Sequence, residues 1–300
     1  MKLSYLMRAA NKYLAAAIKC GYKVWSMRHL SFNIFLLLIF IITGVRADDF
    51  GAMPPDIARI KKRGELVVAM YYEDVPLFCM RNSSNELEGI DIEIARDIAE
   101  KLGVKLTLNR NSKTFDEIVQ TVANRKADIG LSSLSDTLER ATTVSFTTPY
   151  WSLRQALLVN RLKLSAYKDH PDFKKIELLL NQGGIEIGVL KGSSYVDFAK
   201  KIFPLATIVS YPTLAQGIED TKNSKLLAFL YDEVEVMNWN KLHPEDSLFL
   251  KSDFITRSED TLAIAVHWQD NHLLSWLNLS IEQSRNNFFK ELKAKYSDLK

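Results

Sequence analysis

Residues 132–151 read SSLSDTLERATTVSFTTPYW and directly follow the apolar run ADIGL at residues 127–131. Hydroxyl side chains and one arginine, Arg140, are therefore gathered at the end of a short buried strand. Such a composition is typical of a helix capped by Ser135, with Arg140 as a solvated charge. It is equally typical of a loop that holds a carboxylate, because a guanidinium offers paired N–H donors to that group. The residues on either side decide between these alternatives.

Short apolar strands alternate with amphipathic helices on the N-terminal side of this stretch. Asp91 is placed to cap the first long helix, and Gly103 is placed to end it. Strand–helix–strand alternation is typical of a parallel sheet covered by helices. From the apolar periodicity we expect strands at 65–70, 104–108 and 127–133 and helices at 90–102 and 115–122.

The alternation breaks at residues 147–160, which are extended for longer than the earlier strands, as a chain crossing between two domains would be. A second α/β set follows. A last strand at 262–268 and one long helix from Leu273 to Lys295, with Leu274 turned inward, complete the chain. The second set should comprise strands at 185–190, 206–210 and 226–233 and helices at 195–201 and 213–220.

The composition excludes some classes of protein. Three hundred residues, 47% of them hydrophobic, are enough for one large core or two medium cores. Residues 1–47 hold seven Lys and Arg and no acidic residue, so the rest carries 32 basic and 36 acidic residues, a net charge of −4. A mildly acidic body lacks the basic surface that binding to a nucleic-acid backbone requires. We expect no nucleic-acid partner.

Residues 1–47 are predicted to be a signal peptide with a long leader. A basic residue precedes an unbroken apolar segment at 34–42, and suitable residues stand three and one positions before a cut at Asp48. The apolar segment is shorter than the roughly 20 residues of a spanning helix, so cleavage is favoured over a permanent anchor. Met27 is an alternative start that would give a signal of ordinary length.

The two cysteines, Cys20 and Cys79, exclude an internal disulfide in the mature chain, because Cys20 lies in the leader. No set of cysteines and histidines has the spacing of a zinc site. We therefore expect neither a metal ion nor a cofactor.

Four segments together resemble the family 3 extracellular solute-binding proteins, the periplasmic receptors for polar amino acids, over about residues 57–297. The resemblance implies a two-lobed type II periplasmic-binding-protein fold of the α/β class, in which each lobe is a mostly parallel sheet flanked by helices. Two crossover hinges would join lobe 1, residues 48–153 and 257–300, to lobe 2, residues 154–256. The segments are GIDIEIARDIAEKLGVKLTL (89–108), ADIGLSSLSDTLERATTVSFTTPYW (127–151), IGVLKGSSYVDFAK (187–200) and YDEV (231–234).

The ligand-binding positions of that family map onto this sequence one by one. The resemblance implies that Arg140 forks onto the α-carboxylate of a ligand, and that Ser133 and Ser135 contact the ligand's main-chain atoms. Ser194, in KGSSY, maps to a hydroxyl at a helix N-terminus that binds the same carboxylate, although a simple N-cap is the alternative. Asp232, in YDEV, maps to the acceptor for the α-ammonium group.

An aromatic platform for the ligand's side chain is the least defined part of the match. Tyr71, Tyr72 and Trp151 lie at expected strand ends, and we predict Tyr72 and Trp151 as ligand-binding residues. The stretch MYYEDVPLF carries one residue more than the family pattern, so the ring that stacks on the ligand stays open.

The sequence therefore predicts a periplasmic receptor that captures an amino acid or similar small zwitterion and delivers it to the membrane permease of an ABC transporter. We expect a monomer without catalytic activity. One alternative is an enzyme, because cyclohexadienyl and arogenate dehydratases resemble this family, with Glu73, Glu88 or Asp136 as the catalytic acid. A periplasmic accessory or sensor protein is the other, but it would not require Arg140 and Asp232 together.

Overall fold

The computed structural model describes residues 53–296, and the chain from Pro54 onward forms one compact unit. The predicted signal peptide, its alternative start at Met27 and the cut at Asp48 lie outside the described residues. Within residues 53–296, no helix combines the length and the apolar character needed to span a membrane.

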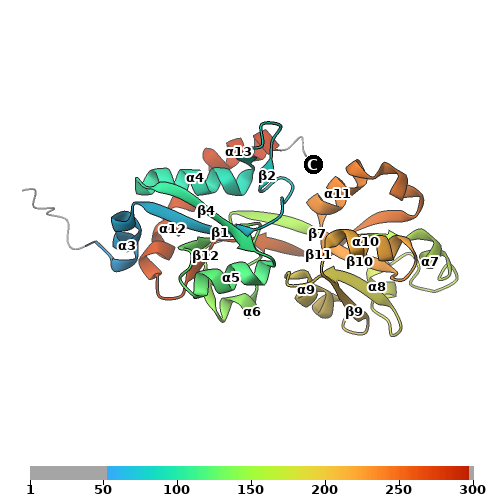
Figure 1. Cartoon of the computed structure of the whole chain (residues 1–300). Coiled ribbons are helices and arrows are strands. Elements are labelled where there is room, and N and C mark those ends of the chain that lie inside the picture. Colours follow the sequence, from blue (N-terminus) through green and yellow to red (C-terminus); the bar gives the residue numbers. More distant parts are fainter. Residues whose placement is uncertain (1–52, 297–300) are drawn as a thin grey trace, which may run out of the picture. The chain divides into compact units, whose positions relative to one another are not determined.

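Two five-stranded sheets form the frame of the molecule (Figure 1). The first sheet has the strand order β4-β1-β5-β12-β6. In it β1 lies parallel to β4 and β5, whereas β12 runs antiparallel to β5 and β6. Its strands are β1 (Glu65–Tyr71), β4 (Lys105–Ser112), β5 (Ile129–Gly130), β6 (Val144–Phe146) and β12 (Ala265–His267).

Helices cover the first sheet, and the longer of them bury apolar residues in the core. In the helix at residues 90–102 the isoleucines four residues apart, Ile90, Ile94 and Ile98, are all buried, as their spacing predicts. The two-stranded hairpin β2 (Met80–Arg81) and β3 (Leu87–Glu88) precedes this helix. The helices are α3 (Pro55–Arg63), α4 (Ile90–Leu102), α5 (Phe115–Ala123), α6 (Leu138–Ala141), α12 (Asn271–Ser284) and α13 (Phe288–Tyr296).

The second sheet has the order β11-β7-β10-β8-β9. Strands β10, β8 and β9 are parallel, and β7 runs antiparallel to its neighbours β10 and β11. The strands are β7 (Trp151–Asn160), β8 (Glu186–Leu190), β9 (Thr207–Tyr211), β10 (Ala228–Asp232) and β11 (Leu250–Leu262). The helices are α7 (Arg161–Ser165), α8 (Ile176–Leu180), α9 (Tyr195–Ile202), α10 (Leu214–Lys222), α11 (Glu233–Leu242) and the 3-10 turn η1 (Pro244–Leu248).

Strands β7 and β11 carry the chain from the first lobe to the second and back (Figure 1). They pair with each other from Trp151 opposite Leu262 to Asn160 opposite Leu250, with an irregularity between Phe254 and Glu259. The connection between the lobes is therefore a two-stranded ribbon, and the fold has the two crossovers that the sequence predicts. The lobe boundaries expected from the sequence fall inside these two strands.

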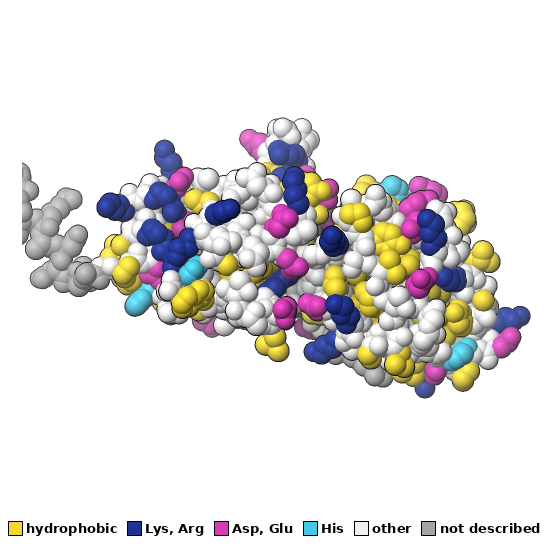
Figure 2. Space-filling view, turned by 60° about the horizontal axis from the view of Figure 1, so that its bottom comes forward, with side chains coloured by type: hydrophobic (Ala, Val, Ile, Leu, Met, Phe, Trp, Pro, Cys, Tyr) yellow, Lys and Arg dark blue, Asp and Glu magenta, His cyan; other side chains and the backbone are white. Residues whose placement is uncertain are grey.

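Basic side chains gather around α3 (Figure 2), and most of their charge is used inside the lobe. Arg59 and Arg125 both pair with the buried Asp270 at the start of α12, while Arg63 pairs with the buried Asp128 before β5. These pairs fasten α3 and α12 to the end of the first sheet that lies away from the second lobe.

Two expectations about helices are wrong. The C-terminal segment forms two helices, because the polar run Ser284 to Asn287 interrupts the apolar repeat, and Leu273 rather than Leu274 is fully buried. Asp91 does not cap α4. The N-cap is Gly89, whose φ of 128° and close approach to the Phe78 carbonyl, 2.3 Å from where a Cβ would stand, exclude other residues.

Candidate functional site

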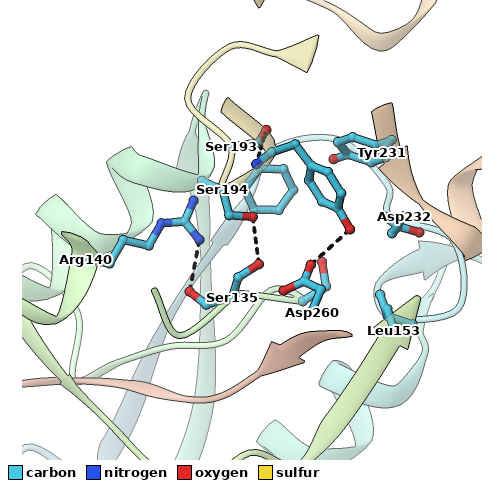
Figure 3. A pocket seen from close by; sticks show the side chains of 11 residues that line it. Ser135, Arg140, Leu153, Ser193, Ser194, Tyr231, Asp232 and Asp260 are labelled. Carbon is cyan, nitrogen blue, oxygen red and sulfur yellow. Dashed lines mark hydrogen bonds between the residues drawn. The ribbon is translucent and has the colours of Figure 1, made fainter. Parts of the chain in front are cut away.

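One pocket is lined by residues from both lobes (Figure 3). Most of its polar lining lies at the carboxyl ends of β5, β8 and β10 or shortly after them, which is where ligand sites form in α/β sheets. The cavity has a volume of about 10 Å³, which is room for about one water molecule. An amino acid therefore enters only if the lobes separate. The lining residues are Phe115, Ser133, Ser135, Arg140, Leu153, Ser193, Ser194, Tyr195, Tyr231, Asp232 and Asp260.

The pocket brings together five of the seven residues that the sequence singles out, namely Ser133, Ser135, Arg140, Ser194 and Asp232. Ser133, Ser135 and Arg140 come from the first lobe, whereas Ser194 and Asp232 come from the second. Residues almost one hundred positions apart in the sequence thus face one cavity.

The two predicted aromatic platforms, Tyr72 and Trp151, are not part of the lining. The Trp151 ring packs edge-on against Phe78, with a centroid separation of 6.3 Å. In β7, Trp151 lies two residues before Leu153, which does line the pocket. The two positions are therefore about 7 Å apart along the strand. The Tyr72 hydroxyl donates to Glu73, and the Lys113 ammonium lies over the Tyr72 ring.

Three aromatic side chains do line the pocket, namely Tyr195 and Tyr231 from the second lobe and Phe115 from the first. Phe115 is the first residue of α5. It stacks on Tyr71 with 4.7 Å between ring centroids and 13° between planes. From the sequence, Phe115 is expected only as the first residue of a helix at 115–122. Phe115 begins this helix shortly after the end of β4. That position in the sequence indicates that its side chain could lie near the carboxyl ends of the strands.

Arg140 lies in α6, whose N-cap is Thr137 rather than Ser135: the Thr137 hydroxyl accepts from the Arg140 amide. The capped helix expected from the sequence is present, but Arg140 is only 6% exposed and is not a solvated charge. Its Nε and Nη2 donate to Asp116 Oδ1 at 3.1 and 3.0 Å, and Nη1 donates to the Ser135 carbonyl at 3.1 Å. A guanidinium has five N–H donors, so two remain for a carboxylate in the pocket.

The loop that carries Ser133 is held in place by the buried Asp91. Ser133 has a positive φ of 42°, and its amide donates to Asp91 Oδ2 at 2.6 Å. Asp91 Oδ1 accepts from the Tyr150 hydroxyl at 2.7 Å. Burial raises the pKa of Asp91 to about 7, although the bonds from Tyr150 and Ser133 oppose that rise. Asp91 thus positions a pocket residue.

The two lobes contact each other beside the pocket. The Ser135 and Ser194 hydroxyl oxygens share a hydrogen bond of 2.8 Å, and the Asp116 amide donates to the Gly192 carbonyl at 3.1 Å. Ser194 is at the N-cap of α9 but its side chain makes no cap bond. The simple N-cap alternative is therefore not what the structure shows for Ser194.

Asp232 ends β10 and is the N-cap of α11, a helix that the sequence analysis did not predict. Its carboxylate accepts from the Glu235 amide at 2.8 Å. Burial raises the pKa of Asp232 to about 6, and the backbone N–H groups of the cap limit the rise. The Asp232 side chain therefore both caps α11 and lines the pocket.

Asp260, in β11, is a pocket residue that the sequence analysis missed. It is 2% exposed, its Oδ2 accepts from the Tyr195 hydroxyl at 3.1 Å, and its Oδ1 accepts no hydrogen bond from the described residues. Burial raises the pKa of Asp260 to about 7; the neighbouring Asp232 adds to the rise, and Ser135, Tyr195 and Arg140 oppose it. A single acid in a strand has no sequence pattern that marks it.

The site has the groups needed to bind opposite charges. Arg140 lines a cavity that the carboxyls of Asp232 and Asp260 also line, and serine hydroxyls lie between them (Figure 3). Among residues 53–296, no three His, Cys, Asp or Glu side chains are placed to hold a metal ion. Cys79 is buried, which raises the pKa of its thiol to about 11, so it is a poor nucleophile.

Comparisons with known proteins agree with this geometry. The family model described as bacterial extracellular solute-binding proteins, family 3, matches residues 66–298. The ABC transporter arginine-binding protein 1 of Escherichia coli is 27% identical over 206 residues, covering 68% of this chain and 78% of that protein. The cyclohexadienyl dehydratase of Pseudomonas aeruginosa is 26% identical over 223 residues, covering 73% and 76%.

Solved structures give the same result for the fold. An amino acid ABC transporter substrate-binding protein from Streptococcus pneumoniae, solved with bound L-arginine, superposes with a TM-score of 0.64 at 27% identity. The superposition covers 81% of this chain and 97% of that one. The two-lobed α/β architecture of this chain is therefore the architecture of amino-acid-binding proteins.

Proposed function

This chain belongs to the bacterial extracellular solute-binding proteins of family 3, and from that premise we propose that it captures an amino acid between its two lobes. The ligand's α-carboxylate pairs with Arg140 and bonds to the hydroxyls of Ser135 and Ser194. Its α-ammonium pairs with Asp232, and its main-chain atoms contact Ser133. Phe115 replaces Tyr72 and Trp151 as the proposed ring that contacts the ligand's side chain.

The observation that carries the proposal is the placement of Arg140 and Asp232 on opposite lobes but in the lining of one pocket. An amino acid that pairs with both contributes binding energy only when the lobes are close together. It therefore shifts the population toward the closed arrangement by as much as its affinity differs between the two arrangements. Capture and lobe closure are in this way one process, and no chemical step is required.

We further propose that the protein acts in the periplasm, after cleavage of the leader before Asp48, and delivers its ligand to the permease of an ABC transporter. The family is extracellular, and relatives such as the Escherichia coli protein belong to ABC transporters. N-terminal sequencing of the protein from the cell envelope tests the cleavage. An intact leader in the membrane fraction would contradict a released receptor.

A thermal-shift screen of the secreted protein against the twenty amino acids tests ligand capture. A ligand at 100 times its Kd stabilises the folded state by about 2.7 kcal/mol, which is readily seen as a rise in Tm. Titration calorimetry of the best ligand then gives its affinity. If no amino acid raises the Tm, the proposal of an amino-acid receptor is wrong.

A dehydratase-like enzyme is a second candidate, because buried carboxyls adjoin the pocket and one relative is a dehydratase. Glu235 lies one turn after Asp232, and burial, together with Asp232 and Glu73, raises the pKa of Glu235 well above its ordinary value. A carboxyl whose pKa is raised in this way keeps its proton to a higher pH than a free carboxyl does, as a general acid requires.

The acids named from the sequence are less suitable than Glu235 for that reaction. Glu73 is exposed, Glu88 lies in the β2–β3 hairpin, and Asp136 accepts a hydrogen bond from the Thr261 hydroxyl. Neither these three acids nor Glu235 line the pocket, whose lining carboxyls are Asp232 and Asp260. Incubation with prephenate or arogenate and detection of the aromatic product decides between the candidates: turnover would identify an enzyme.

A further inference from the structure

The charges that line the pocket are not balanced. Arg140 is its one basic side chain, and Arg140 already pairs with Asp116 just outside the lining. Asp232 and Asp260 are both acidic and both line the pocket. A zwitterionic ligand with one carboxylate and one ammonium would satisfy Arg140 and one of the two acids. The other acid would stay without a cation.

Asp260 is the acid that would stay without a cation. The side chains around it compensate its negative charge poorly. In β11 it stands opposite the apolar Leu153 of β7. The Tyr195 hydroxyl of α9 donates to its Oδ2, whereas its Oδ1 accepts no hydrogen bond from the described residues. The Ser135 hydroxyl adjoins it but shares its hydrogen bond with Ser194. Figure 3 shows the Asp260 carboxyl between Ser135 and Asp232.

A buried carboxyl with an oxygen that bonds to nothing is costly unless a partner arrives, because burial of an uncompensated polar group is unfavourable. A donor on the ligand is the partner that this position can receive. The nearest alternative cation, the Arg140 guanidinium, is directed instead to Asp116 and to the Ser135 carbonyl.

We propose that Asp260 makes the pocket select an amino acid with a net positive charge, one whose side chain ends in an ammonium or a guanidinium group. This specificity rests on the proposed function as an amino-acid receptor. The second positive charge of the ligand balances the second acid of the pocket, so a neutral amino acid of the same shape binds more weakly.

L-Arginine and L-citrulline test the proposal, because they have nearly the same shape and differ in the charge of the side chain. Calorimetric titration of the wild-type protein should show at least about tenfold tighter binding of arginine, as expected for a buried charge pair. The variant Asp260→Asn should lose most of that difference by binding arginine more weakly while its affinity for citrulline changes less than threefold.

Asp253→Asn is the matched control, because Asp253 lies in the same strand, loses the same charge and pairs with Lys251 away from the pocket. It should bind both ligands like the wild type. Equal wild-type affinities for arginine and citrulline, or an equal loss of both in Asp260→Asn, would overturn the role of Asp260 but leave the receptor intact. Binding of none of the twenty amino acids would instead overturn the proposed function itself.

Proton release gives a second measurement that does not depend on the affinities. The groups that face Asp260 are the hydroxyls of Ser135 and Tyr195, the Asp232 carboxylate and the Arg140 guanidinium. A cation beside Asp260 lowers the pKa of this carboxyl, so at pH 7 arginine binding should expel part of a proton. Titrations in two buffers with different ionisation enthalpies measure the released proton, and the release should be smaller in Asp260→Asn, where only Asp232, with its pKa of about 6, still contributes. Equal proton release in both proteins would contradict the assignment.

Discussion

The hydroxyl oxygens of Ser135 and Ser194 lie 2.8 Å apart and share a hydrogen bond, although 59 residues separate them in the chain. Ser135 follows β5 of the first sheet, and Ser194 follows β8 of the second. The bond therefore closes the cleft at the point where a ligand's carboxylate is proposed to bind. The same two hydroxyls must separate before a ligand can enter and then bond to that ligand.

Gly192 should control how closely the lobes approach. Its φ is 68°, and a Cβ there would lie 2.7 Å from the Thr114 Cβ of the other lobe. Gly192→Ala should therefore hold the lobes apart, and small-angle scattering of the protein without added ligand should show a larger radius of gyration than for the wild type.

Gly184→Ala is the control for Gly192→Ala, because its φ is 82° and a Cβ there meets no atom within 4 Å. Both variants should lose about 1–2 kcal/mol of stability from the left-handed backbone conformation. Only Gly192→Ala should expand the protein. Equal radii in the three proteins would show that the lobe contact is not populated in solution.

Arg140→Ala should weaken amino-acid binding by about 2–5 kcal/mol, because it leaves a ligand carboxylate without its charged partner. Arg140→Lys should recover little, since an ammonium has no planar fork. Arg96→Ala, which removes an exposed arginine of α4, is the control. Calorimetry that finds Arg140→Ala within threefold of wild type would remove the carboxylate assignment.

Phe115→Leu should weaken ligand binding more than Tyr72→Leu does. Phe115 lines the pocket, whereas Tyr72 lies outside the lining with its hydroxyl on Glu73. The loss for Phe115→Leu should be about 1 kcal/mol, the order of a lost aromatic contact. Titrations well below the Tm of each variant compare them, and a larger effect of Tyr72→Leu would restore the platform predicted from the sequence.

Asp91→Ala should destabilise the protein by about 2–4 kcal/mol, because it leaves the half-buried Ser133 amide and the buried Tyr150 hydroxyl without an acceptor. It should also weaken ligand binding, since Ser133 loses the bond that holds its positive φ. Asp97→Ala, on an exposed turn of the same helix with a salt bridge to Lys101, should change stability by less than about 1 kcal/mol. Urea denaturation measures both, and similar losses would contradict a positioning role for Asp91.

Asp260 should make stability depend on pH in a direction opposite to that of a paired carboxylate. Its pKa is raised to about 7 in the folded protein, against about 3.9 in an unfolded chain. The folded state therefore binds more protons between these values, and the contribution of Asp260 to stability falls as the pH rises from about 4 to 7. Between pH 4 and pH 8, the stability of Asp260→Asn relative to the wild type should rise by about 2–4 kcal/mol. Parallel pH profiles of the two proteins would show that Asp260 is not buried as described.

Much of the fold followed from the sequence because its signals are local. The four-residue spacing of Ile90, Ile94 and Ile98 predicted α4, and Gly103 does end it in a left-handed conformation with φ of 68°. The break in alternation after residue 147 predicted that the chain changes lobes. The sequence does not predict the division into α12 and α13, because the polar run from Ser284 to Asn287 is short and lies within an otherwise regular apolar repeat.

The sequence also predicted a group of ligand-binding residues, because each stands in a short motif that resembles the family. They are Ser133, Ser135, Arg140, Ser194 and Asp232. Motifs of this kind sit at strand ends, and the order of the strands in the sheets brings those ends to one cavity. The sequence alone determined which chemical groups were available: a guanidinium, hydroxyls and a carboxylate.

Only the tertiary structure decided which other residues join them. Asp260 gains its pocket position from the pairing of β11 with β7, and Phe115 gains its position from the packing of α5 beside the strand ends. Gly89, and not Asp91, is the N-cap of α4. The Asp91 carboxylate instead accepts a hydrogen bond from the Ser133 amide and holds that loop in place. Local sequence sets periodicity and capping, whereas the burial and partners of a single side chain depend on residues distant in the chain.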